Sequence, residues 1–159
     1  MNIVLYEPEI PANTGNIGRT CVATNSSLHL IEPLGFRLTD RYIKRSGMDY
    51  WDRVNVTRYL NWQDFIEKHP GANCFFATTK AGRKYSDVQY SMDDYLVFGP
   101  ESRGIPEVLL YSNSSRCIRI PMSDGERSLN LSNSVAIMLY EALRQNDFFG
   151  LDFCEDGIV

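Results

Sequence analysis

The sequence predicts an α/β fold, in which a mainly parallel sheet is flanked by helices. Short apolar runs alternate along the chain with segments of helical periodicity, as in strand–helix–strand units. The length of 159 residues suits a single domain over 1–159. A composition of 43% hydrophobic and 23% charged residues supports a buried core and argues against disorder.

The first half of the chain predicts three strands and two helices. A buried strand over 3–6 ends before Pro8 and Pro11, and a helix follows over 15–25. A second strand over 28–31 stops at Pro33. A short helix then covers 39–46 and a weak strand covers 54–56.

The second half predicts three strands and three helices. They are a helix over 62–68, strands over 74–77 and 95–98, a helix over 106–111 that starts at a proline, a strand over 117–120 and a helix over 129–143. Ligands bind at the carboxyl ends of parallel strands, so we expect the loops that follow these ends to meet. Those loops begin near Glu7, Thr78, Gly99 and Pro121.

Several classes of protein are excluded by what the sequence lacks. No apolar run approaches the ~18–20 residues of a spanning helix, and no basic region followed by an apolar stretch opens the chain. We therefore expect a cytoplasmic protein without membrane contact. The absence of GxGxxG gives no support to a dinucleotide site. The four cysteines, Cys21, Cys74, Cys117 and Cys154, are widely scattered, which predicts free thiols. With only His29 and His69 beside them, we expect no metal site.

The charges are unevenly distributed along the chain. Sixteen Lys and Arg against 20 Asp and Glu give a net charge of −4. Residues 141–159 carry five acids against Arg144, which is also −4, so 1–140 is neutral and 150–159 forms an acidic tail. Segment 36–45 holds four cations and one acid. This balance excludes indiscriminate phosphate coating but permits a nucleic-acid partner on one basic face.

The loop over 7–19 leads from the first strand into a helix. Unpaired backbone N–H groups at a helix N-terminus favour a polar or anionic ligand. Arg19 would lie one turn into this helix, with Asn13 in the preceding loop. The alternative is a well-capped helix with a surface arginine.

The loop over 98–106 contains two glycines and two prolines within eight residues. Glycine permits close approach of a ligand to the backbone, and proline fixes the path of the chain. Glu101 and Arg103 would then flank a pocket. The alternative is a tight turn with a local ion pair.

The segment over 118–133 ends a strand at Pro121 and opens a helix that alternates Ser or Asn with Leu. Ser128 is a candidate cap of that helix. The further small polar residues indicate backbone bends around a ligand, or polar contacts in a buried site. The alternative is a long cap with Asn130 and Asn133 merely solvated.

Together the three segments resemble the motifs of the SPOUT superfamily of RNA methyltransferases, in its TrmH-like branch. The motifs occur in order, namely Asn13 and Arg19 with five residues between them, Phe98-Gly99-Pro100-Glu101 with Gly104, and Ile120-Pro121-Met122 followed by Ser128-Leu129-Asn130-Leu131-Ser132-Asn133. Similarity extends from Met1 to about Gly150 and is greatest to the YibK/TrmL subgroup, the tRNA (cytidine/uridine wobble)-2′-O-methyltransferases.

This resemblance implies a deep trefoil knot in the C-terminal part of the chain and a homodimer with the last helix and the helix over 15–25 at its interface. It implies methyl transfer from S-adenosylmethionine to the ribose 2′-hydroxyl of the wobble nucleotide, position 34, in the tRNA anticodon stem-loop, with S-adenosylhomocysteine as product. The cofactor pocket would be lined by Ala77, Thr78, Gly99, Ile120, Met122, Ser128 and Leu129.

The resemblance also implies that Arg19 activates the hydroxyl. Because arginine keeps its proton in proteins, we favour a guanidinium that stabilises the developing alkoxide and orients the adjacent phosphate. Asn13 would orient Arg19 or the ribose, Glu101 would hold its loop or receive an arginine across the dimer, and Ser128 and Asn130 would fix cofactor and phosphate.

Two basic groups are candidate phosphate contacts: Arg37, Arg41, Lys44 and Arg45, and Lys80, Arg83 and Lys84. The nearby aromatics Tyr42, Tyr50 and Trp51 are candidates for stacking on bases. The alternative is a solvated charged face with the aromatics turned inward. Two other functions stay open, a 2′-O-methyltransferase acting on another tRNA or rRNA site and a non-catalytic RNA-binding factor of the same fold.

Overall fold

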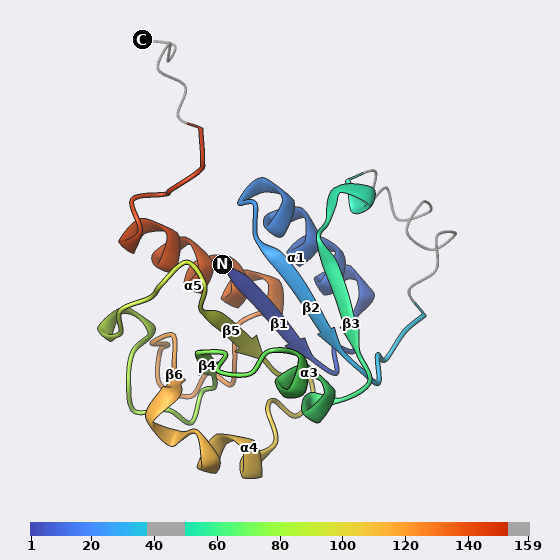
Figure 1. Cartoon of the computed structure of the whole chain (residues 1–159). Coiled ribbons are helices and arrows are strands. Elements are labelled where there is room, and N and C mark those ends of the chain that lie inside the picture. Colours follow the sequence, from blue (N-terminus) through green and yellow to red (C-terminus); the bar gives the residue numbers. More distant parts are fainter. Residues whose placement is uncertain (38–49, 153–159) are drawn as a thin grey trace.

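A computed structural model describes residues 1–37 and 50–152, which form a six-stranded, fully parallel sheet (Figure 1). Along the sheet the strands follow the order β3-β2-β1-β5-β4-β6. Their bounds are β1 Asn2–Tyr6, β2 Ser27–Ile31, β3 Val56–Tyr59, β4 Cys74–Ala77, β5 Tyr95–Phe98 and β6 Cys117–Ile118. From β1 the chain adds β2 and β3 on one side and then crosses to the other side for β4. Strand β5 follows between β4 and β1, so β1 and β5 flank the point where the strand order reverses.

Helices cover both faces of this sheet. Those described are α1 Pro11–Ala23, α3 Trp62–Lys68, α4 Glu107–Ser112 and α5 Leu131–Gln145, with the short 3₁₀ turns η1 Trp51–Arg53, η2 Tyr85–Asp87 and η3 Ser114–Arg116. Helices α1 and α5 pack against one another on one face, and α3 and α4 contribute to the core of the other. The predicted α/β fold with a mainly parallel sheet is confirmed.

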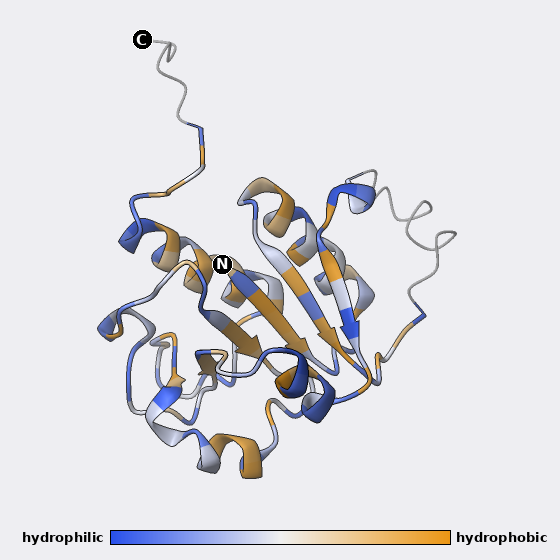
Figure 2. Ribbon diagram, in the orientation of Figure 1, coloured by the Kyte–Doolittle hydropathy of each residue, from blue (hydrophilic) through white to orange (hydrophobic). Residues whose placement is uncertain are grey.

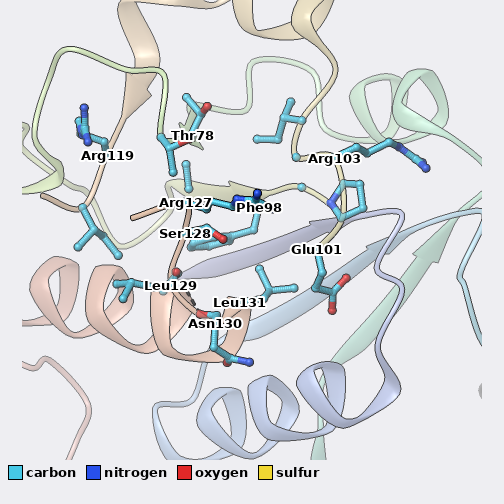
Figure 3. A pocket seen from close by; sticks show the side chains of 18 of the residues that line it. Thr78, Phe98, Glu101, Arg103, Arg119, Arg127, Ser128, Leu129, Asn130 and Leu131 are labelled. Carbon is cyan, nitrogen blue, oxygen red and sulfur yellow. Dashed lines mark hydrogen bonds between the residues drawn. The ribbon is translucent and has the colours of Figure 1, made fainter. Parts of the chain in front are cut away.

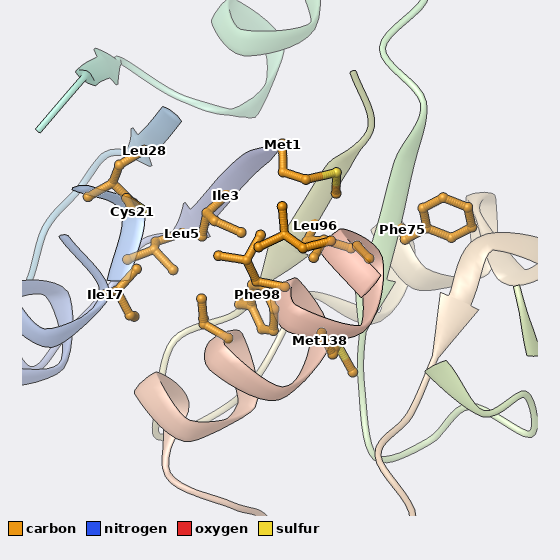
Figure 4. Close-up of a cluster of buried hydrophobic side chains, with 14 of the residues drawn as sticks. Met1, Ile3, Leu5, Ile17, Cys21, Leu28, Phe75, Leu96, Phe98 and Met138 are labelled. Atoms are coloured by element: carbon orange, nitrogen blue, oxygen red, sulfur yellow. The ribbon is translucent and has the colours of Figure 1, made fainter. Parts of the chain in front are cut away.

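The two faces are separated by the alternation of side chains along each strand. In β1, Ile3 and Leu5 belong to the cluster under α1 and α5, whereas Val4 belongs to the cluster under α3 and α4. Figure 4 shows the first cluster, with Met138 of α5 close to the side chains of the central strands. Burying each such side chain contributes roughly 1.5–3 kcal/mol, so the central strands anchor the loops that follow them.

Three predicted strands and helices have the bounds that the sequence indicates, namely α3, β4 and β5. The remaining described elements are present with shifted ends. The first helix starts at Pro11, four residues earlier than predicted, because proline fits the first helical position. Asn13 therefore lies in the first turn of α1 and not in a loop.

The edge strand and the last helix also differ from their predictions. The third strand runs over Val56–Tyr59 and not 54–56, because these are the residues that pair in parallel with β2. Figure 2 shows β3 ending in hydrophilic residues, unlike the largely hydrophobic β1. Helix α5 is capped by Asn130, and the predicted cap Ser128 lies before it. The helix predicted over 39–46 and part of the tail, 153–159, lie outside the described residues.

Within the part of the chain that the structure describes, no helix combines the length and apolar character needed to cross a bilayer. In the same residues, no group of three or more His, Cys, Asp or Glu side chains is placed to hold a metal ion.

Candidate active site

A cavity of about 580 Å³ lies at the carboxyl edge of the sheet, where the strand order reverses (Figure 3). Its walls come from four segments, those that follow β1, β4, β5 and β6, together with the first turns of α5. The loops predicted to meet at the strand ends do meet here. Its volume lies in the range of small-molecule sites, about 300–1,000 Å³.

Two carboxylates, Glu9 and Glu101, join the loop after β1 to the loop after β5 through reciprocal hydrogen bonds. We call this set of bonds, made by Glu9, Ile10, Glu101 and Ser102, the clasp. Glu101 accepts hydrogen bonds from the backbone N–H groups of Glu9, at 2.9 Å, and Ile10, at 3.2 Å. Glu9 in turn accepts from the backbone N–H of Ser102 at 2.9 Å and from its hydroxyl at 2.7 Å. These bonds from Ser102 lower the pKa of the Glu9 carboxyl. Each of the two loops is therefore held in place by hydrogen bonds from the other loop.

The clasp continues through two asparagines to α5. Asn13, which is buried, donates from Nδ2 to Oε1 of Glu101 at 2.9 Å. Its Oδ1 accepts from Nδ2 of Asn130 at 3.0 Å. Oδ1 of Asn130 caps α5 by accepting from the backbone N–H of Ser132 at 2.9 Å. One chain of hydrogen bonds thus runs across the cavity wall through three sequence-distant segments.

The remaining wall of the cavity consists largely of apolar side chains and of the tightly packed backbone around Gly99. Ile120, Met122 and Leu129 line it beside Phe98 and Met138. Gly99 also lines it, and a Cβ added there would lie 2.3 Å from the Ile105 nitrogen and 2.4 Å from the Gly104 carbonyl carbon. Only glycine fits this position, because the backbone of residues 104 and 105 occupies the space that a side chain would need. An apolar slot of this kind suits a flat heteroaromatic ring.

Four cations line the cavity, and two of them are neutralised by carboxylates. Lys80 pairs with Glu107, and Arg103 pairs with Glu7. The hydrogen bond to Glu107 raises the pKa of the Lys80 ammonium. Arg119 and Arg127 have no ion pair with any described carboxylate, and Figure 3 shows Arg127 between Thr78 and Ser128.

The cavity brings together ten of the residues that the sequence motifs single out. They are Asn13, Ala77, Thr78, Gly99, Glu101, Ile120, Met122, Ser128, Leu129 and Asn130. Of the predicted RNA contacts, Lys80 lines the cavity, whereas Arg41, Lys44 and Arg45 lie outside the described residues.

Arg19 does not line the cavity of its own chain. It is exposed on α1, and its guanidinium lies 4.8 Å from the centre of the Tyr50 ring. The Tyr50 hydroxyl donates to the Gly15 carbonyl at 2.8 Å, which ties the ring to α1. Six residues of helix turn Arg19 about 120° away from Asn13 and about 9 Å along the axis.

Sequence reasoning missed the partners that support the motif residues. Glu9 and Ser102, which close the clasp, lie 93 positions apart. Arg119 and Arg127 directly precede Ile120 and Ser128, so their adjacency to motif residues was the available signal. Met138 of α5 belongs to the hydrophobic core and also lines the cavity.

A family model for the SpoU rRNA methylase family matches residues 1–140. The chain belongs to the SpoU rRNA methylase family. The resemblance to these RNA methyltransferases, drawn from the three motifs, is thereby confirmed. A protein of Listeria monocytogenes is 54% identical over 154 residues, which cover 94% of this chain and 90% of that protein. The Escherichia coli tRNA (cytidine(34)-2′-O)-methyltransferase is 47% identical over 151 residues, which cover 94% and 96%.

Solved structures of RNA methyltransferases share the fold. A Bacillus anthracis protein superposes with a TM-score of 0.92 at 48% identity, covering 96% of this chain and 98% of that one. A structure from work on 2-OH methylation of C/U34 on tRNA has a TM-score of 0.84 at 42% identity, covering 92% and 95%. An AdoMet-bound rRNA methyltransferase of Sinorhizobium meliloti has a TM-score of 0.78 at 27% identity, covering 90% and 55%.

Proposed function

We propose that this chain methylates the ribose 2′-hydroxyl of nucleotide 34 in the tRNA anticodon stem-loop, using S-adenosylmethionine. The observation that carries the proposal is that residues from each of the three motifs, Arg19 excepted, line one cavity at the carboxyl edge of the sheet. Similarity to the E. coli cytidine(34) enzyme along nearly the whole chain supports the choice of substrate. We place this activity in the cytoplasm, because the proposed substrate is tRNA.

The residues present suit the cofactor. When bound, S-adenosylmethionine supplies an activated methyl group on sulfur. Ile120, Met122 and Leu129 offer apolar surface for its adenine, and Gly99 and Thr78 line the same cavity. The hydrogen-bonded loops hold this surface in place, so alignment of the reacting groups provides much of the rate acceleration.

Arg19 serves the 2′-oxygen as a cation. It stabilises the negative charge that develops as the hydroxyl loses its proton, and it orients the neighbouring phosphate. Because Arg19 lies outside the cavity of its own chain, we assign it to the cavity of a second copy. Exposed apolar side chains on α5, Ile137 and Tyr140, and Ile10 beside α1 support the homodimer that this requires.

The same proposal includes the C-terminal knot. The connection from β4 to β5, residues 78–94, contacts the following chain on both sides of its path. Before the motif segment, Arg119 donates its backbone N–H to Arg83 and accepts from Tyr85, both at 2.9 Å. After it, Gln145 of α5 accepts from the Tyr90 backbone N–H at 3.0 Å. These contacts support a path in which the C-terminal segment passes through this connection.

The direct test is mass spectrometry of nucleosides from tRNA incubated with the protein and isotopically labelled cofactor. We expect one ribose methyl group, on nucleotide 34. Methylation of a different tRNA nucleotide, or of ribosomal RNA alone, would contradict the proposed substrate and would favour a 2′-O-methyltransferase that acts on another site. Binding of tRNA without any methyl transfer would favour the non-catalytic RNA-binding factor.

Mixed dimers test the assignment of Arg19. Arg19→Ala and Asn130→Ala chains, each inactive alone, are mixed after unfolding and refolding. If Arg19 acts across a two-fold interface, the mixed dimer contains one intact site, and random mixing restores about a quarter of wild-type activity. If Arg19 acts within its own chain, both sites stay defective and no activity returns.

A further inference from the structure

The outer edge of the sheet beyond β6 carries four cations that the motifs do not use. We call Arg83, Lys84, Arg116 and Arg119 the β6-edge patch. Backbone hydrogen bonds bring its segments together, since Arg119 N–H donates to the Arg83 carbonyl at 2.9 Å and Arg119 pairs with Lys84 in a parallel bridge. Arg83 Nη1 also lies 3.5 Å from the Ser115 carbonyl, next to Arg116.

The positive charge of this patch is not neutralised within the described residues. Five other cations, for example Arg58 and Lys68, have a carboxylate oxygen within 4.0 Å. None of the four patch cations has such a partner among the described carboxylates. Segments 78–86 and 108–122, which carry the patch, contain no Asp or Glu at all. A protein of net charge −4 therefore concentrates cations on one edge.

The patch is continuous with the candidate active site. Arg83, Lys84 and Arg116 are exposed, whereas Arg119 is partly buried and lines the cavity. The Nε of Arg119 is buried without a hydrogen-bond partner in the structure, so this side chain retains an unused donor. Because residues 83–85 already bond to the chain just after β6, this sheet edge is closed to an added strand. A polyanion suits it better than an extended peptide does.

We infer that the β6-edge patch binds the phosphate backbone of the substrate tRNA next to the nucleotide held in the cavity. This inference rests on the proposed function for its ligand. It adds Arg116 and Arg119 to the cations considered from the sequence, and it locates them on one surface. Phosphate contacts made by arginine and lysine position the RNA without reading its sequence.

The test compares two variants that remove equal charge. Lys84→Gln/Arg116→Gln removes two patch cations, and Arg58→Gln/Lys68→Gln removes two cations that are ion-paired elsewhere. The affinity for tRNA is measured from about 50 to about 300 mM salt, a range over which phosphate contacts weaken markedly. We expect the slope of log K against log salt to become shallower by about 2 in the patch variant, because each lost phosphate contact removes about one. Affinity falls at least about tenfold at low salt.

The control variant keeps the wild-type slope, and both variants keep the wild-type affinity for S-adenosylmethionine in calorimetry. If the patch variant is poorly folded by circular dichroism, Arg83→Gln/Lys84→Gln replaces it with the same expected slope change. A patch variant with the wild-type slope, while wild-type protein methylates tRNA, overturns the inference alone. Wild-type protein that binds tRNA through the patch but methylates nothing overturns the proposed function alone.

Discussion

The backbone packing around Gly99 makes a sharp prediction for Gly99→Ala. The new Cβ would lie 2.3 Å from the Ile105 nitrogen, 2.4 Å from the Gly104 carbonyl carbon and 2.9 Å from the Gly104 Cα. All three are backbone atoms of one tight loop, in which Gly104 N–H donates to the Pro100 carbonyl at 2.9 Å. No flexible side chain is available to yield, so the loop itself must move.

The cost of this movement follows from the geometry. Forcing a methyl group into a packed site typically costs 1–3 kcal/mol, and backbone contacts this short put Gly99→Ala at about 3 kcal/mol. For a domain of this size, that lowers the melting temperature by about 6–12 °C. The displaced loop carries Glu101 and Ser102, so the clasp loosens and affinity for S-adenosylmethionine falls at least about tenfold.

Gly82→Ala is the matched control, because a Cβ there meets nothing within 4 Å. Its stability should stay within about 0.5 kcal/mol of wild type. Thermal unfolding by circular dichroism and calorimetric titration with S-adenosylmethionine measure both variants. Equal melting temperatures and equal cofactor affinities for Gly99→Ala and Gly82→Ala would refute the packing argument.

Three further predictions concern individual polar side chains, two in the cavity wall and one, His29, in the core. Asn130→Ala should lower the free energy of unfolding by about 1 kcal/mol, because the helix cap is lost. Asn130→Asp should restore the cap and this stability, but it lacks the donor to Asn13 and should stay inactive. Burial lowers the pKa of His29 to about 4, so the unfolded chain binds the proton more readily and stability falls with pH below about 6.5. Urea unfolding should show a loss of about 2 kcal/mol between pH 7.5 and 5, and pH-independent stability would contradict this. Ser102→Ala should raise the pKa of Glu9 in an NMR titration, whereas an unchanged pKa would exclude the hydroxyl as its cause.

The interior of the sheet was predictable because of how it is buried. Strands β4 and β5, Cys-Phe-Phe-Ala and Tyr-Leu-Val-Phe, are covered by helices on both faces and read as continuous apolar runs. The edge strand β3 gives no such signal, because Thr57 and Arg58 are exposed. Its position is fixed by parallel pairing with β2, which is a tertiary effect absent from the local pattern.

The site was predictable only in part, for a similar reason. Motif spacing singled out Asn13, Glu101 and Asn130, and the structure joins them by hydrogen bonds. The other half of the clasp, Glu9 with Ser102, leaves no local signature. An acid next to a proline and a serine in a turn are common, and they acquire meaning only when the two loops meet at one sheet edge.

The polar groups of the cavity wall are largely engaged with one another. Glu101 accepts three hydrogen bonds, and the oxygens of Asn13 and Asn130 are both engaged. A wall built this way is rigid but has few side-chain groups left to act on a bound ribose. Backbone edges, apolar surface and cations are the groups that remain for binding, and this agrees with the two proposals that Arg19 of a second copy and the β6-edge patch contact the RNA.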